Sequence, residues 1–227
     1  MHYLLDYFLH LDVHLEAFVV QYGPWVYALL FLIIFAETGL VVTPFLPGDS
    51  LLFAAGALAA TSGGVLNVWA LVGLLTLAAI LGDAVNYAVG HFIGPRVFKA
   101  EDRTGLWHRL LNRNHLMEAH AFFEKHGGKA VILGRFVPII RTFVPFVAGG
   151  GSMSYPQFAL FNVVGGVIWV GLCVGGGYAF GNVPIVKKNF ELVVVGIVLV
   201  SLIPIVWGYI ANRRKLKAVV AEQESAG

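Results

Sequence analysis

The chain has 227 residues, of which 58% are hydrophobic and only 12% are charged, and its mean hydropathy is +0.79. A soluble domain carries about 25% charged residues, so this composition excludes an ordinary soluble domain and predicts a single all-α integral membrane domain. The formal net charge of +2 conceals an asymmetry, because every lysine and arginine lies at or after Arg96 and the residues before it include six acids.

Residues 1–21 are expected to form an N-terminal amphipathic helix. Apolar side chains recur there every three or four residues, and the acids and histidines fall largely between them. This spacing is typical of a helix with one apolar face. Such a helix either lies in the membrane interface or packs as a partly buried end helix on the bundle.

The next segment consists of two apolar arms on either side of the sequence PFLPGDS. Pro44, Pro47 and Gly48 are expected to break the helix there and to turn the chain, because proline removes a backbone donor and glycine permits a tight turn. The sequence 66–93 that follows is long enough to span a bilayer, for which about 20 residues suffice.

Basic residues first appear in the segment 94–129, which we predict to be a cytoplasmic linker because lysine and arginine mark cytoplasmic loops. The apolar segment 130–150 is interrupted at Pro138 and Pro145, which are expected to break a second hairpin. The basic sequence NRRKLK at 212–217 should also be cytoplasmic.

The number of crossings constrains both hairpins. Two further apolar spans, 157–180 and 189–210, precede the cytoplasmic tail. If the tail is cytoplasmic, the span 189–210 begins outside and the span 157–180 begins in the cytoplasm. The hairpin at 130–150 must then enter and leave on the cytoplasmic side. By the same count the span 66–93 runs from outside to inside, so the first hairpin must enter and leave from outside. The two re-entrant hairpins would face each other. Alternatively, residues 24–43 cross the membrane fully and the N-terminus is cytoplasmic.

The two halves of the chain also resemble each other. The sequence Tyr-Ala-x-Gly ends a span in each half, at Tyr87 to Gly90 and at Tyr178 to Gly181. Internal similarity with opposite orientation is typical of inverted-repeat transporters. The expected parts are the amphipathic helix, a first repeat, the linker, a second repeat, a last span and a tail (1–21, 22–93, 94–129, 130–181, 182–211 and 212–227).

Four charged residues lie inside the hairpin segments. Glu37 and Asp49 flank the turn of the first hairpin, and Arg135 and Arg141 flank the sequence FVPII in the second. A charge at the bilayer centre costs about 3 kcal/mol on insertion scales, so it is kept where it has a partner and a function. Guanidinium groups hold phosphate bidentately and remain charged when desolvated. We therefore predict that Arg135, Arg141 and Asp49 bind an anionic substrate.

Each of these assignments has an alternative. Asp49 is equally well explained as the N-cap of the returning helix, although a helix N-terminus is also where anions bind. The two arginines alternatively form salt bridges to Glu37 and Asp49 that only lock the hairpins together. A third possibility combines the two, with ion pairs that hold the empty site and exchange for ligand.

Two further features concern protons and the cavity wall. Glu37 is the candidate for proton coupling, because burial and a nearby arginine act in opposite directions on the proton affinity of a carboxylate. Asp83, with Asn86 and Tyr87 about one turn on, is a candidate for lining the same cavity. Alternatively, Asp83 makes an interhelical hydrogen bond to Asn162 or to a tyrosine.

Motifs for covalent chemistry are not found in the sequence. The eight histidines fall outside metal-ligand spacings such as H-E-x-x-H, and neither a Walker A motif nor G-x-S-x-G occurs. We therefore expect no enzyme activity, no metal, no cofactor and no nucleic-acid partner.

Four stretches of the sequence resemble the DedA family, also called SNARE-associated or VTT-domain proteins. They are ETGLVVTPFLPGDSLLFAAGALA, GDAVNYAVG, FFEKHGGKAVILGRFVPIIRTFVPFVAGGGSMSY and FNVVGGVIW. The resemblance implies a bacterial inner-membrane protein with facing re-entrant hairpins, and it carries the important acids and arginines of the family onto Glu37, Asp49, Arg135 and Arg141. His91 stands where many members have arginine.

The resemblance also implies a function. Some members are implicated in returning undecaprenyl phosphate across the membrane and others in proton-dependent transport, so the leading expectation is a proton-coupled transporter of a polyprenyl phosphate. One alternative is a proton-coupled exchanger of small cations that supports the membrane potential. Another is a membrane scaffold or chaperone that transports nothing. The oligomeric state is left open.

Overall fold

The computed structural model of the chain describes residues 11–40, 48–62, 64–99, 113–151, 153–184 and 186. These ranges contain helices and no strand, in the order α2 (Leu11–Gly39), α3 (Gly48–Thr61), α4 (Val68–Lys99), α6 (Arg113–His126), α7 (Lys129–Gly134), α8 (Pro138–Gly150) and α9 (Tyr155–Gly181). Residues 1–10, Pro44, Pro47 and the expected span 189–210 lie outside the described residues.

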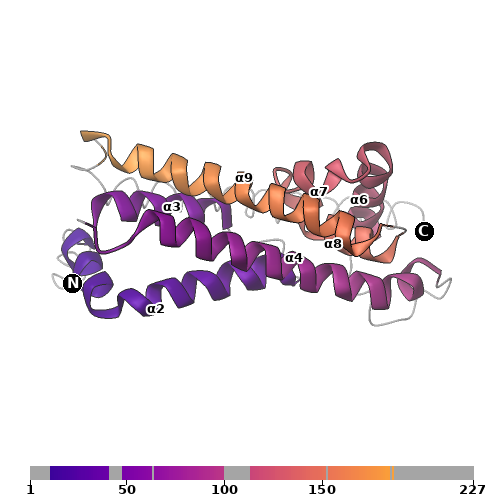
Figure 1. Ribbon diagram of the computed structural model, residues 1–227, viewed down its shortest axis with the longest axis horizontal. Coiled ribbons are helices and arrows are strands. Elements are labelled where there is room, and N and C mark those ends of the chain that lie inside the picture. The colour runs from indigo at the N-terminus through magenta and orange to yellow at the C-terminus, as the bar shows by residue number, and fades with distance from the viewer. Residues whose placement is uncertain are drawn as a thin grey trace, which may run out of the picture.

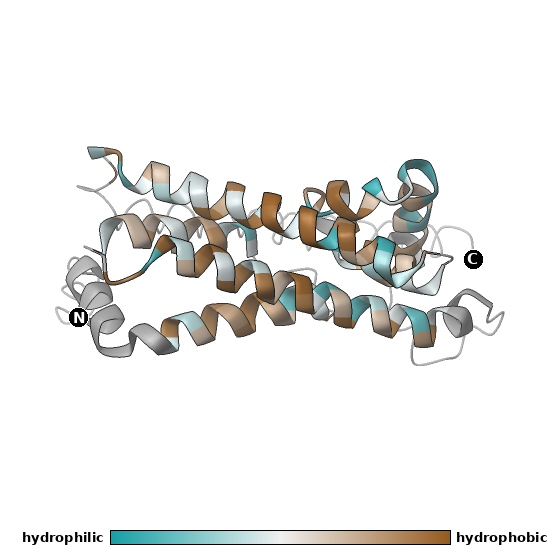
Figure 2. Cartoon of the chain, viewed as in Figure 1, coloured by the Kyte–Doolittle hydropathy of each residue, from teal (hydrophilic) through white to brown (hydrophobic). Residues whose placement is uncertain are grey.

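Two of the described helices are long and apolar enough to cross a membrane, namely Val68–Gly94 of α4 and the whole of α9. Their outer faces carry exposed leucines, such as Leu77 of α4 at 49% and Leu160 of α9 at 63%, and Figure 2 shows hydrophobic residues along both helices. Soluble monomers rarely expose large contiguous apolar surfaces. The described chain is thus an all-α membrane protein.

Shorter helices pack along each of the two spanning helices, α4 and α9. Helix α3 packs along α9, and both α8 and α2 pack along α4. In Figure 1 the α2–α3 hairpin occupies one end of the bundle, and α6, α7 and α8 occupy the other. Each end has its own apolar core, the first around Leu52, Leu75 and Val174 and the second around Phe146 and Phe158.

The helix breaks differ in part from those expected. Helix α3 begins at Gly48, and α8 begins at Pro138, where proline is favoured because the first helical N–H needs no partner. The prediction that Pro145 breaks the second hairpin is wrong, since α8 runs through it. Asn86 of α4 donates its Nδ2 to the Thr142 carbonyl in the preceding turn, at 2.8 Å. This bond ties α8 to α4 close to the proline.

The helix ends also shift the expected boundaries. Helix α2 is continuous from Leu11 to Gly39, so the described part of the expected amphipathic segment continues directly into the first apolar arm. Helix α4 extends to Lys99, into the segment expected to be linker, and α6 lies within that same segment.

Candidate functional site

The tips of the two hairpins meet halfway along the long helices. Glu37 lies in the last turn of α2 and Asp49 is the second residue of α3, while Arg141 lies in the first turn of α8. Asp83 and Trp169, which line the same cavity as Arg141, stand near the middle of the apolar stretches of α4 and α9. Arg141 of the second hairpin segment therefore meets both acids of the first.

Arg141 connects the two hairpins through two ion pairs. Its Nη1 lies 2.8 Å from Oδ1 of Asp49, and its Nη2 donates to Oε1 of Glu37. The backbone N–H of Gly48 donates to the same glutamate oxygen at 3.2 Å. A side chain at position 48 would overlap this carboxylate, so Glu37 would have to move to admit one.

The two acids on Arg141 differ in exposure. The Glu37 side chain is 3% exposed and that of Arg141 is 10% exposed, whereas the Asp49 side chain is 54% exposed. The Arg141–Glu37 pair is thus a desolvated ion pair, which is costly to break by removing one partner. Asp49 is the outer partner and stays accessible from the surface.

Arg135 has a separate set of partners on the long helices. It lies in the short break between α7 and α8, and its Nη2 is 2.6 Å from Oδ2 of Asp83 on α4. The same nitrogen donates to Oδ1 of Asn162 on α9, and the Asn162 amide in turn donates to the Ile80 carbonyl at 3.1 Å. Asp83 and Asn162, given above as an alternative hydrogen-bonded pair, are instead bridged by Arg135, which donates to both.

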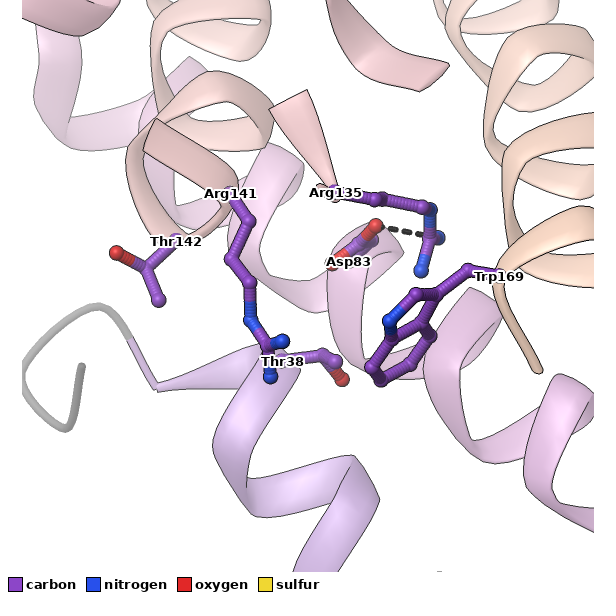
Figure 3. A pocket seen from close by; sticks show the side chains of 6 residues that line it. All are labelled: Thr38, Asp83, Arg135, Arg141, Thr142 and Trp169. Atoms are coloured by element: carbon purple, nitrogen blue, oxygen red, sulfur yellow. Dashed lines mark hydrogen bonds and ion pairs between the residues drawn. The ribbon is translucent and has the colours of Figure 1, made fainter. Parts of the chain in front are cut away.

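Trp169 touches both halves of the site, and sequence reasoning missed it. Its indole Nε1 donates to Oδ1 of Asp49 at 2.7 Å. The guanidinium carbon of Arg141 lies 4.9 Å from the centre of the ring, and that of Arg135 lies 5.7 Å away. Figure 3 shows the indole beside both arginines. The available signal was a tryptophan in the middle of an apolar span, within the quoted stretch FNVVGGVIW.

The other residues expected to line the cavity take different places. Asn86 is fully buried and donates to the Thr38 carbonyl at 3.2 Å and to the Thr142 carbonyl, so it fastens α2 and α8 to α4. Tyr87 donates its hydroxyl to the Met153 carbonyl at 2.6 Å and lines a different, surface groove. Of the three candidates, Asp83 is the one that lines the central cavity.

The central cavity is small. About 10 Å³ remains free between Asp83, the two arginines, Trp169 and two threonines, Thr38 and Thr142. This is close to the least space that holds one water molecule. A phosphate group does not fit there in this conformation.

The charges of the site do not balance. Glu37, Asp49 and Asp83 face two guanidinium groups, which leaves one negative charge in excess when all five groups are ionised. The surplus charge falls on Asp49, whose side chain is 54% exposed, and the uptake of one proton or one cation would neutralise the cluster. In the part of the chain that the structure describes, no group of three histidine, cysteine or acidic residues could hold a metal ion.

Comparisons with known proteins place the chain among described membrane proteins. The family model described as "VTT domain" matches residues 46–179. The chain is 53% identical to Protein DedA of Escherichia coli K12 over 214 residues, which is 94% of this chain and 95% of that protein. It is 35% identical to Inner membrane protein YqjA of the same organism, over 80% of each chain. It is also 34% identical to Inner membrane protein YghB of Salmonella typhimurium, over 82% of each. No solved structure matches the chain.

Proposed function

The chain belongs to the DedA family of VTT-domain proteins of the bacterial inner membrane, and from this membership we propose that it transports a lipid phosphate across the bilayer. The proposed substrate is a polyprenyl phosphate, such as the undecaprenyl phosphate that is recycled from the outer leaflet. The proposed process moves the lipid and forms no covalent bond, so the protein is a transporter and not an enzyme.

One observation carries the proposal. Two guanidinium groups are buried halfway along the spanning helices, and each is held by a carboxylate from a different helix. Arginine binds phosphate bidentately and stays charged without water. Ion pairs whose partners come from separate segments can exchange a carboxylate for a phosphate when those segments move apart.

The exposure of the acids indicates where that exchange begins. Asp49, at 54% exposed, is the partner of Arg141 that solvent or a headgroup reaches first. We propose that the phosphate displaces Asp49 from Arg141, and that Glu37 then takes up a proton because the cluster already holds one negative charge too many. In this scheme transport depends on protons because the entry of phosphate drives the protonation of Glu37.

The same positions support a proposed re-entrant topology. The tip of each hairpin reaches the midpoint of α4 and α9 and the chain then turns back, so we infer that α2 with α3, and α7 with α8, enter the membrane without crossing it. The basic sequences favour a cytoplasmic location for the segment after α4 and for the C-terminus.

We also infer an inverted repeat. A Cβ atom at Gly177 of α9 would collide with the Phe53 carbonyl of α3, and one at Gly90 of α4 would collide with the Phe146 carbonyl of α8. Both phenylalanines begin the sequence Phe-x-Ala-Gly. The returning arm of each half thus packs on the span of the other in the same register. In this register Gly90 corresponds to Gly177. The repeated sequence Tyr-Ala-x-Gly instead pairs Gly90 with Gly181, which lies about one helical turn further along α9.

The proposal is tested by reconstituting the purified protein in liposomes that contain a fluorescent polyprenyl phosphate. Leaflet exchange is measured with and without a pH gradient for wild type, Glu37→Gln, Arg141→Ala and Arg141→Lys, with Lys125→Ala on the exposed face of α6 as the control. We expect exchange that the gradient accelerates, loss of exchange in Arg141→Ala, and a gradient-independent residual rate in Glu37→Gln. Full exchange by Arg141→Lys would rule out the bidentate role, since lysine lacks the planar fork.

The surplus acid supports one second candidate, a proton-coupled exchanger of small cations in which Glu37 and Asp49 hold the cation. Uptake of a labelled cation into vesicles that lack polyprenyl phosphate distinguishes it from the first. A protein that exchanges neither lipid nor cation, and that keeps its cellular function when Glu37 and Arg141 are swapped, would be a scaffold.

A further inference from the structure

Trp169 has contacts that a packing residue does not need. It is 2% exposed, and its ring lies within cation–π distance of both arginines, a range of about 6 Å. Its N–H donates to the same Asp49 oxygen that accepts the hydrogen bond from Arg141. One indole therefore contacts the two bases and the accessible acid at the same time.

The face of α9 around this indole is shaped to admit Arg135. Asn162, Gly165, Gly166 and Trp169 recur at helical spacing and share one face of the helix. A Cβ at Gly165 would lie 3.1 Å from Nε of Arg135, whereas one at Gly166 would meet Ile80 first, at 3.2 Å. Gly165 thus makes room for the guanidinium, and Trp169 closes that room on one side.

An unused donor and a small free volume lie beside the indole. Nε of Arg135 is buried and has no hydrogen-bond partner among the described residues. The free space beside it is about 10 Å³, and its walls include Trp169 and both arginines. The remaining wall residues are two threonines and the ion-paired Asp83, so the indole is the largest uncharged group that could vacate space.

We propose that Trp169 is a positioning residue that gates anion access, and this rests on the proposed function. In the closed state its ring occupies the volume in which Arg135 and Arg141 would share one phosphate. Displacement of Asp49 by that phosphate removes the acceptor of the indole N–H, and the ring then leaves the volume. The ligand class is a phosphate monoester on a hydrocarbon chain, and the gate couples its binding at Arg141 to the opening of Arg135.

Tryptophan fluorescence tests the gate without altering the site. The other tryptophans are replaced by phenylalanine, which leaves Trp169 as the sole emitter (Trp25, Trp69, Trp107 and Trp207). The protein in detergent is titrated with farnesyl monophosphate, and with farnesol as the control that has the same chain and no charge. Calorimetry on the same sample measures binding independently. We expect a saturable shift of the emission maximum with the phosphate and none with farnesol.

The outcomes separate the gate from the proposed function. Calorimetric binding of the phosphate without any change in Trp169 emission would overturn the gate and leave lipid-phosphate binding standing. Absence of calorimetric binding to the folded protein would overturn the proposed function and the gate together. An equal shift with farnesol would show that the ring responds to the chain alone, which also contradicts the gate.

Two substitutions distinguish gating from simple packing. Trp169→Leu removes the ring and the N–H, and we expect it to bind farnesyl monophosphate about fivefold more tightly, because one cation–π contact no longer has to be broken. Trp169→Phe keeps an aromatic ring and should change affinity less. If Trp169→Leu folds and binds more weakly than wild type, the residue only supports packing.

Discussion

The Arg141–Glu37 pair makes a quantitative prediction about stability. Replacing Arg141 with methionine keeps much of the side-chain volume but leaves the carboxylate of Glu37, 3% exposed, without its guanidinium partner. Removing one partner of a buried ion pair costs about 3 to 5 kcal/mol. Because the Asp49 side chain is 54% exposed, water can compensate it, and its share should be at most about 1 kcal/mol. We therefore expect Arg141→Met to lower the free energy of unfolding by about 3 kcal/mol.

Second substitutions identify the origin of that loss. Adding Glu37→Gln to Arg141→Met removes the stranded charge and keeps an acceptor for the Gly48 N–H, so most of the stability should return. Adding Asp49→Asn instead should restore little. Unfolding free energies are measured by titrating detergent micelles of each variant with sodium dodecyl sulfate and following helicity. The reasoning fails if Asp49→Asn restores as much as Glu37→Gln, or if Arg141→Met alone costs less than 1 kcal/mol.

Three further changes test the packing and the hydrogen bonds around the site. Gly177→Ala should destabilise the fold by about 1 to 3 kcal/mol through overpacking against the α3 backbone. Gly175→Ala is the control, because a Cβ there meets nothing within 4 Å. Equal melting temperatures of the two variants would contradict the close approach of α3 and α9. Asn162→Ala should cost about 1 to 3 kcal/mol because it removes a buried acceptor from a guanidinium, as measured by the same detergent titration. Tyr87→Phe should lose about 1 kcal/mol through its bond to Met153 and keep the exchange rate in liposomes; loss of exchange would place Tyr87 in the transport path.

The positions of the charges were predictable because the bilayer restricts where they occur. Glu37 and Arg141 each stand out as a charge in an apolar segment next to prolines, which marks both as residues that need a partner. The individual partners were not predictable, since Arg135 and Arg141 are separated by a helix break whose shape the sequence leaves open. With α8 beginning at Pro138, Arg141 reaches the first hairpin and Arg135 turns toward the long helices.

Side-chain direction explains the other differences. Asn86 and Tyr87 are neighbours in sequence, but successive residues on a helix point about 100° apart, so Asn86 faces α2 and α8 while Tyr87 faces the start of α9. A two-residue motif cannot by itself say which of them meets the site. Trp169 was missed for a related reason, because its polar contacts come from segments far away in the sequence.

The two arginines are held by different parts of the fold, and this suggests different roles. Arg135 is held by Asp83 of α4 and Asn162 of α9, two helices whose mutual packing closes the bundle. Arg141 is held by Glu37 and Asp49, which both belong to the opposite hairpin. Separation of the hairpins would therefore break the Arg141 pairs first and leave the Asp83–Arg135 pair in place. In the proposed transport cycle, Arg141 captures the phosphate, and Arg135 supplies a fixed second charge once Trp169 has moved.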